Sequence, residues 1–184
     1  KPLIAALVGG KISPTAQEHA SAVLSGLSSV SDNAIAIKDA EGIDPLVNLL
    51  REGNADAKEH AAAALAQLAL HAQASLEIAK AGAVSAFVQW LADPTLGPPE
   101  VAARALSEIA LDNPNTQSQI AEEGAISHLV AMVAMAVRGE YTAIGRHTTS
   151  SRQVTAMKHA NMAAGALATL AKDNIVIQVM ITEE

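Results

Sequence analysis

The sequence predicts an all-α protein in which helical units stack into a solenoid. Similar segments recur along the chain, and Leu24, Leu65 and Leu106 stand at equivalent places 41 residues apart. Half of the 184 residues are hydrophobic but only 2% are aromatic, so the core must consist of aliphatic side chains and alanine. A period of about 40 residues with helical patterning inside it is typical of stacked helical repeats.

Each unit is expected to contain three helices, of which the first is short and begins with polar residues. In "DNPNTQSQIAEEG", Asn113 is suited to cap the helix and Pro114 fits its first position. The first helix ends at a glycine, which is Gly42, Gly82 or Gly124 in the successive units. Glycine accepts a positive φ, so we expect a sharp turn at each of these places.

The second and third helices differ in composition. The second is apolar on one side, as in "IDPLVNLL" at 43–50. The third is rich in alanine, as in "EHAAAALAQLAL" at 59–70, where Leu65 and Leu68 anchor the helix. Its alanines allow neighbouring helices to approach more closely than large side chains would, so the simple composition is a packing requirement.

This order of segments resembles the armadillo repeat. The resemblance rests on a helix that ends in Glu-Gly or Ala-Gly, followed by "GIDPLVNLL" and then by "EHAAAALAQLAL". It implies a right-handed superhelical solenoid of three-helix repeats, closer to the vacuolar armadillo scaffold and U-box ligase branch than to the nuclear import adaptors. HEAT repeats are the alternative, disfavoured by the recurring short first helix and glycine turn. The expected divisions are a partial repeat at 1–14, repeats at about 31–70, 71–111 and 112–172, the start of the next at 173–184, and an insertion at about 138–156.

The insertion is indicated by spacing. From the glycine turn to the equivalent leucine of the third helix is 24 residues in the middle unit and 43 in the last. Long loops are usually either functional or disordered, so a mobile loop and a folded or partner-contacting extension remain alternatives. Tyr141, Arg146 and Arg152 are the candidate contacts here, and "RHTT" at 146–149 fits a weak phosphorylation pattern.

The resemblance also indicates a binding face. In armadillo proteins the third helices line the concave groove, so their outward positions are the candidate partner-binding residues. These positions are three or four residues apart and therefore share one side of a helix. The candidates are His19, His60, Ala63, Gln67, Arg104, Glu108, His159 and Thr169.

The rows of side chains with which known members of the family bind their ligands are missing from this face. Import adaptors carry a Trp and an Asn in successive repeats, and the Asn side chains pair with the backbone of an extended peptide. Catenin-like grooves instead offer rows of Lys and Arg to acidic ligands, which this chain lacks. Gln67 still offers an amide to a peptide backbone. The Trp position holds Ala22, Ala63, Arg104 and Gly165, and the Asn position holds Gly26, Gln67, Glu108 and Thr169.

Three residue pairs have both a functional and a structural interpretation. His19 and His60 occupy equivalent positions, but packed helices stand about 8 to 10 Å apart, too far for a shared metal ion. We therefore expect polar surface histidines, some of them contacting a partner, and no metal site. Arg104 and Glu108 are expected to form either a surface ion pair or a charged spot in the groove. Phe87 and Trp90 are expected to belong to the core, or Trp90 serves as a partly exposed anchor for a partner.

Composition and motifs argue against other classes of protein. A formal net charge of −7 disfavours nucleic acid as a partner. No apolar run reaches the length of a membrane span, and the absence of cysteine removes disulfides and thiolate chemistry. "LVGGKIS" at 7–13 lacks the spacing of a phosphate-binding loop. No catalytic constellation stands out, so we expect neither enzyme activity nor a cofactor.

The sequence thus predicts a non-catalytic scaffold that presents its concave surface to a protein or an extended peptide. The alternatives are the substrate-recognition arm of a larger ubiquitin ligase, a nuclear transport adaptor or a structural subunit of a large assembly. The chain begins inside an apolar periodic segment, so we expect a piece of a longer protein, with further repeats or partner subunits covering both ends. The expected location is intracellular, in the cytoplasm, with the nucleus and the cilium as alternatives.

Overall fold

The computed structural model describes residues 2–8, 13–138, 149–172 and 174–183, and these residues form helices without any strand. The second, third and first helices of successive units follow the order that the sequence predicts. The elements are α1 (Pro2–Val8), α2 (Pro14–Ser28), α3 (Ser31–Asp39), α4 (Ile43–Glu52), α5 (Ala55–Ala69), α6 (Ala72–Lys80), α7 (Ala83–Ala92), the 3-10 turn η1 (Pro94–Leu96), α8 (Pro99–Ala110), α9 (Pro114–Glu122), α10 (Ala125–Arg138), α11 (Thr149–Ala171) and α12 (Ile175–Glu183).

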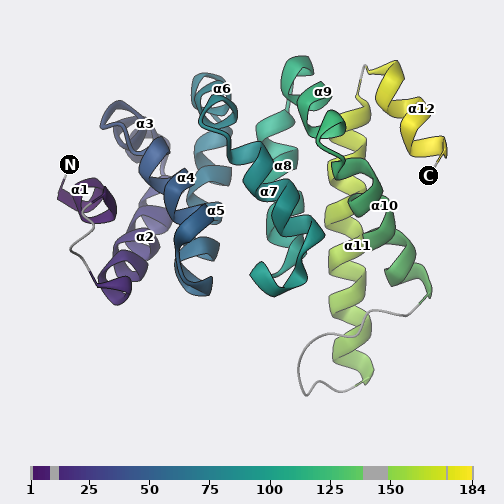
Figure 1. Cartoon of the computed structure of the whole chain (residues 1–184), viewed down its shortest axis with the longest axis horizontal. Coiled ribbons are helices and arrows are strands. Elements are labelled where there is room, and N and C mark those ends of the chain that lie inside the picture. The colour runs from purple at the N-terminus through teal and green to yellow at the C-terminus, as the bar shows by residue number, and fades with distance from the viewer. Residues whose placement is uncertain (1, 9–12, 139–148, 173, 184) are drawn as a thin grey trace.

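The helices form three parallel rows along the long axis of the molecule. The N- and C-terminal ends of the chain lie at opposite ends of this axis (Figure 1). The third helices α2, α5, α8 and α11 pack against one another in sequence, and so do the second helices α4, α7 and α10. In Figure 1 the second helices lie in front of the third helices. This arrangement confirms the all-α solenoid.

Polar caps begin several of these helices. The side chain of Asn54 accepts a hydrogen bond from the backbone N–H of Ala57 at 2.8 Å, at the start of α5. Asn113 does the same for Thr116 at 3.2 Å, directly before Pro114 in the first turn of α9. These bonds satisfy backbone donors that have no partner within the helix. The predicted start of the first helix in this unit is confirmed.

The core runs through the rows and is mostly aliphatic. Leu65 and Leu68 of α5 are completely buried, and so are several alanines beside them. Phe87 and Trp90 of α7 are 0% and 2% exposed, and their rings stack with centroids 6.5 Å apart. The structural interpretation of this aromatic pair is therefore confirmed. The indole of Trp90 lies so close to Gly97 that a Cβ at that position would overlap it.

The glycine turns are not all alike. Gly82 and Gly124 have φ of 80° and 86°, as the sequence predicts. The expectation was wrong for Gly42, whose φ is −79°, because Glu41 before it takes the left-handed conformation with φ of 60°. Gly42 is small for a different reason: a Cβ there would stand 2.7 Å from Cγ2 of Ile37 and 2.8 Å from its carbonyl oxygen.

The last unit has longer helices than the others. α10 has 14 residues and α11 has 23, and in Figure 1 the first turns of α11 extend below the neighbouring helices. Residues 149–156 of the predicted insertion thus belong to a helix, whereas 139–148, with Tyr141 and Arg146, lie outside the described residues. Arg152 lies within α11, but its side chain is outside the description.

None of the described helices is by itself long and apolar enough to cross a membrane. Only α9 and α10 taken together meet these criteria of length and composition, and the two are bent by 76° at the break between them.

Candidate functional site

Each third helix has one side in the core and the opposite side turned outward. On α5, Leu65 and Leu68 are buried, whereas Gln67 is half-buried on the other side of the helix. The same outward positions on the neighbouring helices form a continuous surface, which we call the third-helix face. It consists of His19, Ala22 and Gly26 on α2, His60, Ala63 and Gln67 on α5, Val101, Arg104 and Glu108 on α8, and Gly165 and Thr169 on α11.

Most of the candidate residues lie on this face. The helical spacing that predicted them places them on adjacent helices that pack side by side. They lie on four helices and form a surface, not a single cluster. His19 is exposed, and the half-buried candidates are His60, Ala63, Gln67, Arg104, Glu108 and Thr169.

His159 departs from the expected surface position. It is 5% exposed, and its Nε2 lies 2.9 Å from Oε2 of Glu100 on α8. The side chain therefore joins α11 to α8 and is not available to a partner on the third-helix face. Glu100 could not be singled out from the sequence, because an acidic residue in the first turn of a helix is favoured by the helix dipole in any case.

Thr169 is also engaged with its neighbours. Its hydroxyl lies 2.9 Å from that of Ser107 on α8, and it donates to the carbonyl of Gly165 at 3.1 Å. The side-chain amide of Gln117 on α9 donates to the carbonyl oxygen of Thr169 at 3.3 Å. A partner that binds here meets a polar seam between two repeats rather than a free hydroxyl.

Arg104 and Glu108 do not form the surface ion pair that was one of their two interpretations. Among the described residues, no carboxylate lies within 4.0 Å of the Arg104 guanidinium. Both side chains are half-buried on α8. The interpretation as a charged spot on the third-helix face is the one that this geometry favours.

Gln67 has a side-chain amide that no described residue engages, and the same face has unfilled positions on α2 and α11. No hydrogen bond joins its side chain to the part of the chain that the structure describes. A Cβ at Gly26 or at Gly165 would have no atom within 4 Å, so the surface is unfilled at these positions on α2 and α11. The face therefore combines an unused donor and acceptor with room for the side chains of a ligand.

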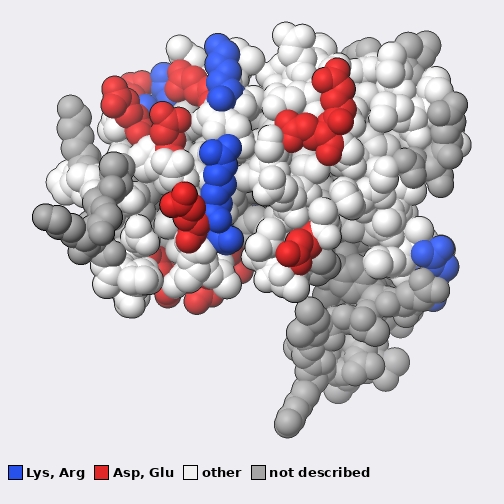
Figure 2. Space-filling model, viewed as in Figure 1, with Lys and Arg blue, Asp and Glu red and all other residues white. Residues whose placement is uncertain are grey.

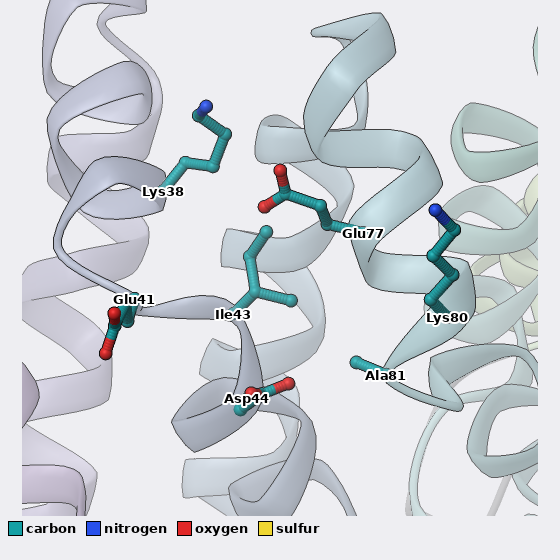
Figure 3. Close-up of a pocket in the computed structure, with 7 residues that line it drawn as sticks. All are labelled: Lys38, Glu41, Ile43, Asp44, Glu77, Lys80 and Ala81. Atoms are coloured by element: carbon teal, nitrogen blue, oxygen red, sulfur yellow. The ribbon is translucent and has the colours of Figure 1, made fainter.

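A second feature lies on the opposite side of the molecule. A hollow of about 330 Å³ opens between the turn from α3 to α4 and the end of α6 (Figure 3). Figure 2 shows charged side chains gathered over α3, α4 and α6. Two repeats form this hollow jointly, so no pattern within one repeat predicts it. It is lined by Lys38, Glu41, Ile43, Asp44, Glu77, Lys80 and Ala81.

The charges of the hollow do not define one ligand. Lys38 is already paired with Asp39 outside it, with 3.0 Å between Nζ and Oδ1. The remaining lysine and three carboxylates are of mixed sign and line an open surface. Across the described residues, no three His, Asp or Glu side chains come together in a way that could hold a metal ion.

Comparisons with known proteins agree with this architecture. Residues 31–70 match the model of the Armadillo/beta-catenin-like repeat. A designed armadillo repeat protein superposes with a TM-score of 0.67 at 21% identity, covering 99% of this chain and 86% of that one.

The fold is an armadillo-repeat solenoid.

Other solved structures fit the same armadillo architecture. An engineered protein has a TM-score of 0.67 at 24% identity, over 99% of this chain and 84% of that one. A chain from a study of the interaction between cadherin and beta-catenin has a TM-score of 0.70 at 16% identity, over 91% of this chain and 28% of that one. No curated protein matches the sequence. These likenesses show the fold and do not distinguish the vacuolar or U-box branch.

Proposed function

We propose that this armadillo solenoid is a non-catalytic scaffold that holds an extended segment of a protein partner on its third-helix face. The observation that carries the proposal is the unengaged amide of Gln67 beside the unfilled surface at Gly26. The fold supports it as well, because one similar structure comes from work on computationally designed armadillo repeat proteins for modular peptide recognition.

The chemistry of Gln67 suits a peptide backbone. Its amide offers a carbonyl acceptor and an NH₂ donor, which match the N–H and C=O of one extended residue. Ala63 lies one turn before it on the same face of α5 and leaves room for the backbone to approach. Main-chain hydrogen bonds of this kind give affinity, while pockets for side chains give specificity.

Different parts of the face favour different side chains of the ligand. On α2, Ala22 and Gly26 are uncharged and small, so this part accepts an uncharged side chain of the ligand. On α8, Arg104 and Glu108 offer one charge of each sign. The partner segment is therefore expected to be neither strongly basic nor strongly acidic, because Arg104 would repel a basic segment and Glu108 an acidic one.

The test is affinity purification of the protein from cells, followed by quantitative mass spectrometry. The groove variant carries His60→Glu, Gln67→Arg and Arg104→Glu. The control variant carries Asn48→Glu and Gln89→Glu at exposed positions of the second helices α4 and α7. Both variants become more negative by the same formal charge, with histidine taken as neutral.

The proposal expects a partner that is lost from the groove variant and retained by the control. Both variants are expected to keep the helical circular dichroism of the wild type, because every substituted position is exposed or half-buried. Retention of all partners by the groove variant would overturn the assignment of the third-helix face. Equal loss from both variants would point to net charge instead of to a site.

A further inference from the structure

The third helices α2, α5, α8 and α11 are each followed by a residue at an equivalent position. All four of these residues are exposed. Those after α2 and α11 are polar, whereas those after α5 and α8 are leucines. In chain order they are Ser29, Leu70, Leu111 and Lys172.

The two leucines are exposed although their helices have neighbours on both sides. Leu70 is 57% exposed and Leu111 is 46% exposed. α5 packs against α2 and α8, and α8 packs against α5 and α11. The first helices that follow, α6 and α9, also pack against α5 and α8 and leave the leucines uncovered. Their exposure therefore belongs to complete inner units, and we call this pair the leucine edge.

The polar equivalents have partners within the chain. The hydroxyl of Ser29 donates to the carbonyl oxygen of Gly26 at 2.7 Å. Nζ of Lys172 lies 2.7 Å from Oδ1 of Asp112. A leucine in water has no comparable interaction and gains free energy only when another apolar surface covers it. Single exposed leucines are ordinary, but here two of them occupy equivalent positions on adjacent helices.

The leucine edge borders the third-helix face. Leu70 comes three residues after Gln67, and Leu111 comes three residues after Glu108. Residues three apart share one side of a helix, and both leucines keep a helical φ, of −61° and −59°. The leucine edge therefore continues the face by one turn at the C-terminal ends of α5 and α8.

An extended segment held by Gln67 directs its side chains along the third helices. The N–H and C=O of one extended residue point to the same side, which in the proposed complex is the side of the Gln67 amide. Successive side chains stand at right angles to these groups and point to alternate sides. One set therefore points toward His60 and Arg104, and the other set points toward the leucine edge.

The spacing suits consecutive side chains of one set. Packed helices stand about 8 to 10 Å apart. Side chains on the same side of an extended segment recur about every 6.6 Å. The difference is within the reach of two flexible aliphatic side chains, so ligand residues two apart can cover Leu70 and Leu111 together.

We propose that the leucine edge binds two apolar side chains of the partner segment that are two residues apart. This inference rests on the proposed binding of an extended segment to the third-helix face. It gives the partner a chemical pattern, in which apolar residues alternate with polar ones. The apolar side chains cover Leu70 and Leu111, and the polar ones lie toward His60 and Arg104.

Selection of random linear peptides displayed on phage, with the wild-type chain as the target, tests the proposal. Enriched peptides are expected to carry two apolar residues separated by one other residue. The enriched peptides are then synthesised, and fluorescence anisotropy measures their affinity for the wild type and for variants. Leu70→Ser with Leu111→Ser gives both positions the residue that α2 carries, and should weaken binding by about tenfold.

Leu76→Ser is the matched control. Leu76 is 46% exposed on α6, the same exposed fraction as Leu111, and it lies outside the third-helix face. This variant is expected to bind the peptides as the wild type does. Circular dichroism is expected to show unchanged helix content in all variants, because the substituted positions are exposed or half-buried.

Gln67→Arg separates this inference from the proposed function. Peptides that this substitution releases are bound on the third-helix face. If those peptides bind the double leucine variant as tightly as the wild type, or lack the alternating apolar residues, the role of the leucine edge is overturned and the proposed function stands. If no linear peptide is enriched, or if Gln67→Arg leaves binding unchanged, the proposed function fails and this inference fails with it.

Discussion

The core side and the outward side of α5 differ in burial. On the core side, Ala61, Leu65 and Leu68 are completely buried, and these contacts determine where the helix lies. On the opposite side, Ala63 and Gln67 are half-buried, and no further row of described helices covers them. Since the buried contacts lie on the core side and not on the outward side, substitutions on the two sides should separate stability from binding.

The largest expected effect is on the core side. Leu65→Ala should lower the free energy of unfolding by about 3 kcal/mol, because it removes buried methyl groups and leaves a cavity. Gln67→Ala, on the other side of the same helix, should change it by less than about 0.5 kcal/mol. Urea denaturation followed by circular dichroism measures both. Equal effects would contradict the division between the two sides.

The sides that face neighbouring helices should show an intermediate effect. His159→Ala removes the partner of the half-buried Glu100 carboxylate and should cost about 2 kcal/mol. A double-mutant cycle with Glu100→Ala isolates the interaction between the two side chains, which we expect to be about 1 kcal/mol. Denaturant midpoints of the four proteins give this energy. Strictly additive effects would show that the contact contributes nothing.

The glycine turns allow a finer comparison. Gly82→Ala and Gly124→Ala should each cost about 1 kcal/mol, because both residues have positive φ. Gly82→Ala should cost about 0.5 kcal/mol more, because the new Cβ displaces the Arg51 guanidinium, which donates to the Gly82 carbonyl at 2.9 Å. Thermal unfolding measures both variants. In an Arg51→Ala background the difference should vanish, and its persistence would exclude this explanation.

The one gain in stability that we expect is on the third-helix face. Gly165→Ala should stabilise the protein by about 0.5 to 1 kcal/mol, because glycine inside a helix is unfavourable and a Cβ here meets no atom within 4 Å. Thermal unfolding would reveal it as a higher midpoint. A loss of stability would mean that this part of the face is more tightly packed than the structure shows.

The architecture could be predicted from the sequence because it depends on local signals. The period of the leucines, the cap at Asn113 and the small residues of the third helices each act within one unit. The burial of Phe87 and Trp90 also followed from their position, which leucines occupy in the preceding unit. Such features repeat, so each unit supports the interpretation of the others.

The features that could not be predicted depend on contacts between units. Gly42 lies against the preceding unit, where an added Cβ would stand 3.2 Å from Cδ1 of Ile4, and Glu41 takes the left-handed conformation in its place. The burial of His159 depends on how α11 is aligned along α8, where His159 meets Glu100. No local pattern reports either distance, and the same holds for the hollow between α3 and α6.

The central claim is that the third-helix face holds the partner, and site-specific photo-crosslinking in cells tests it most directly. A photoreactive phenylalanine analogue at Ala63 samples the third-helix face, and the same analogue at the exposed Asn48 of α4 samples the opposite one. The account predicts a discrete protein adduct from Ala63 that is absent from Asn48 and is lost when Gln67→Arg is added. An adduct from Asn48 alone, or one from Ala63 that Gln67→Arg leaves unchanged, would contradict it.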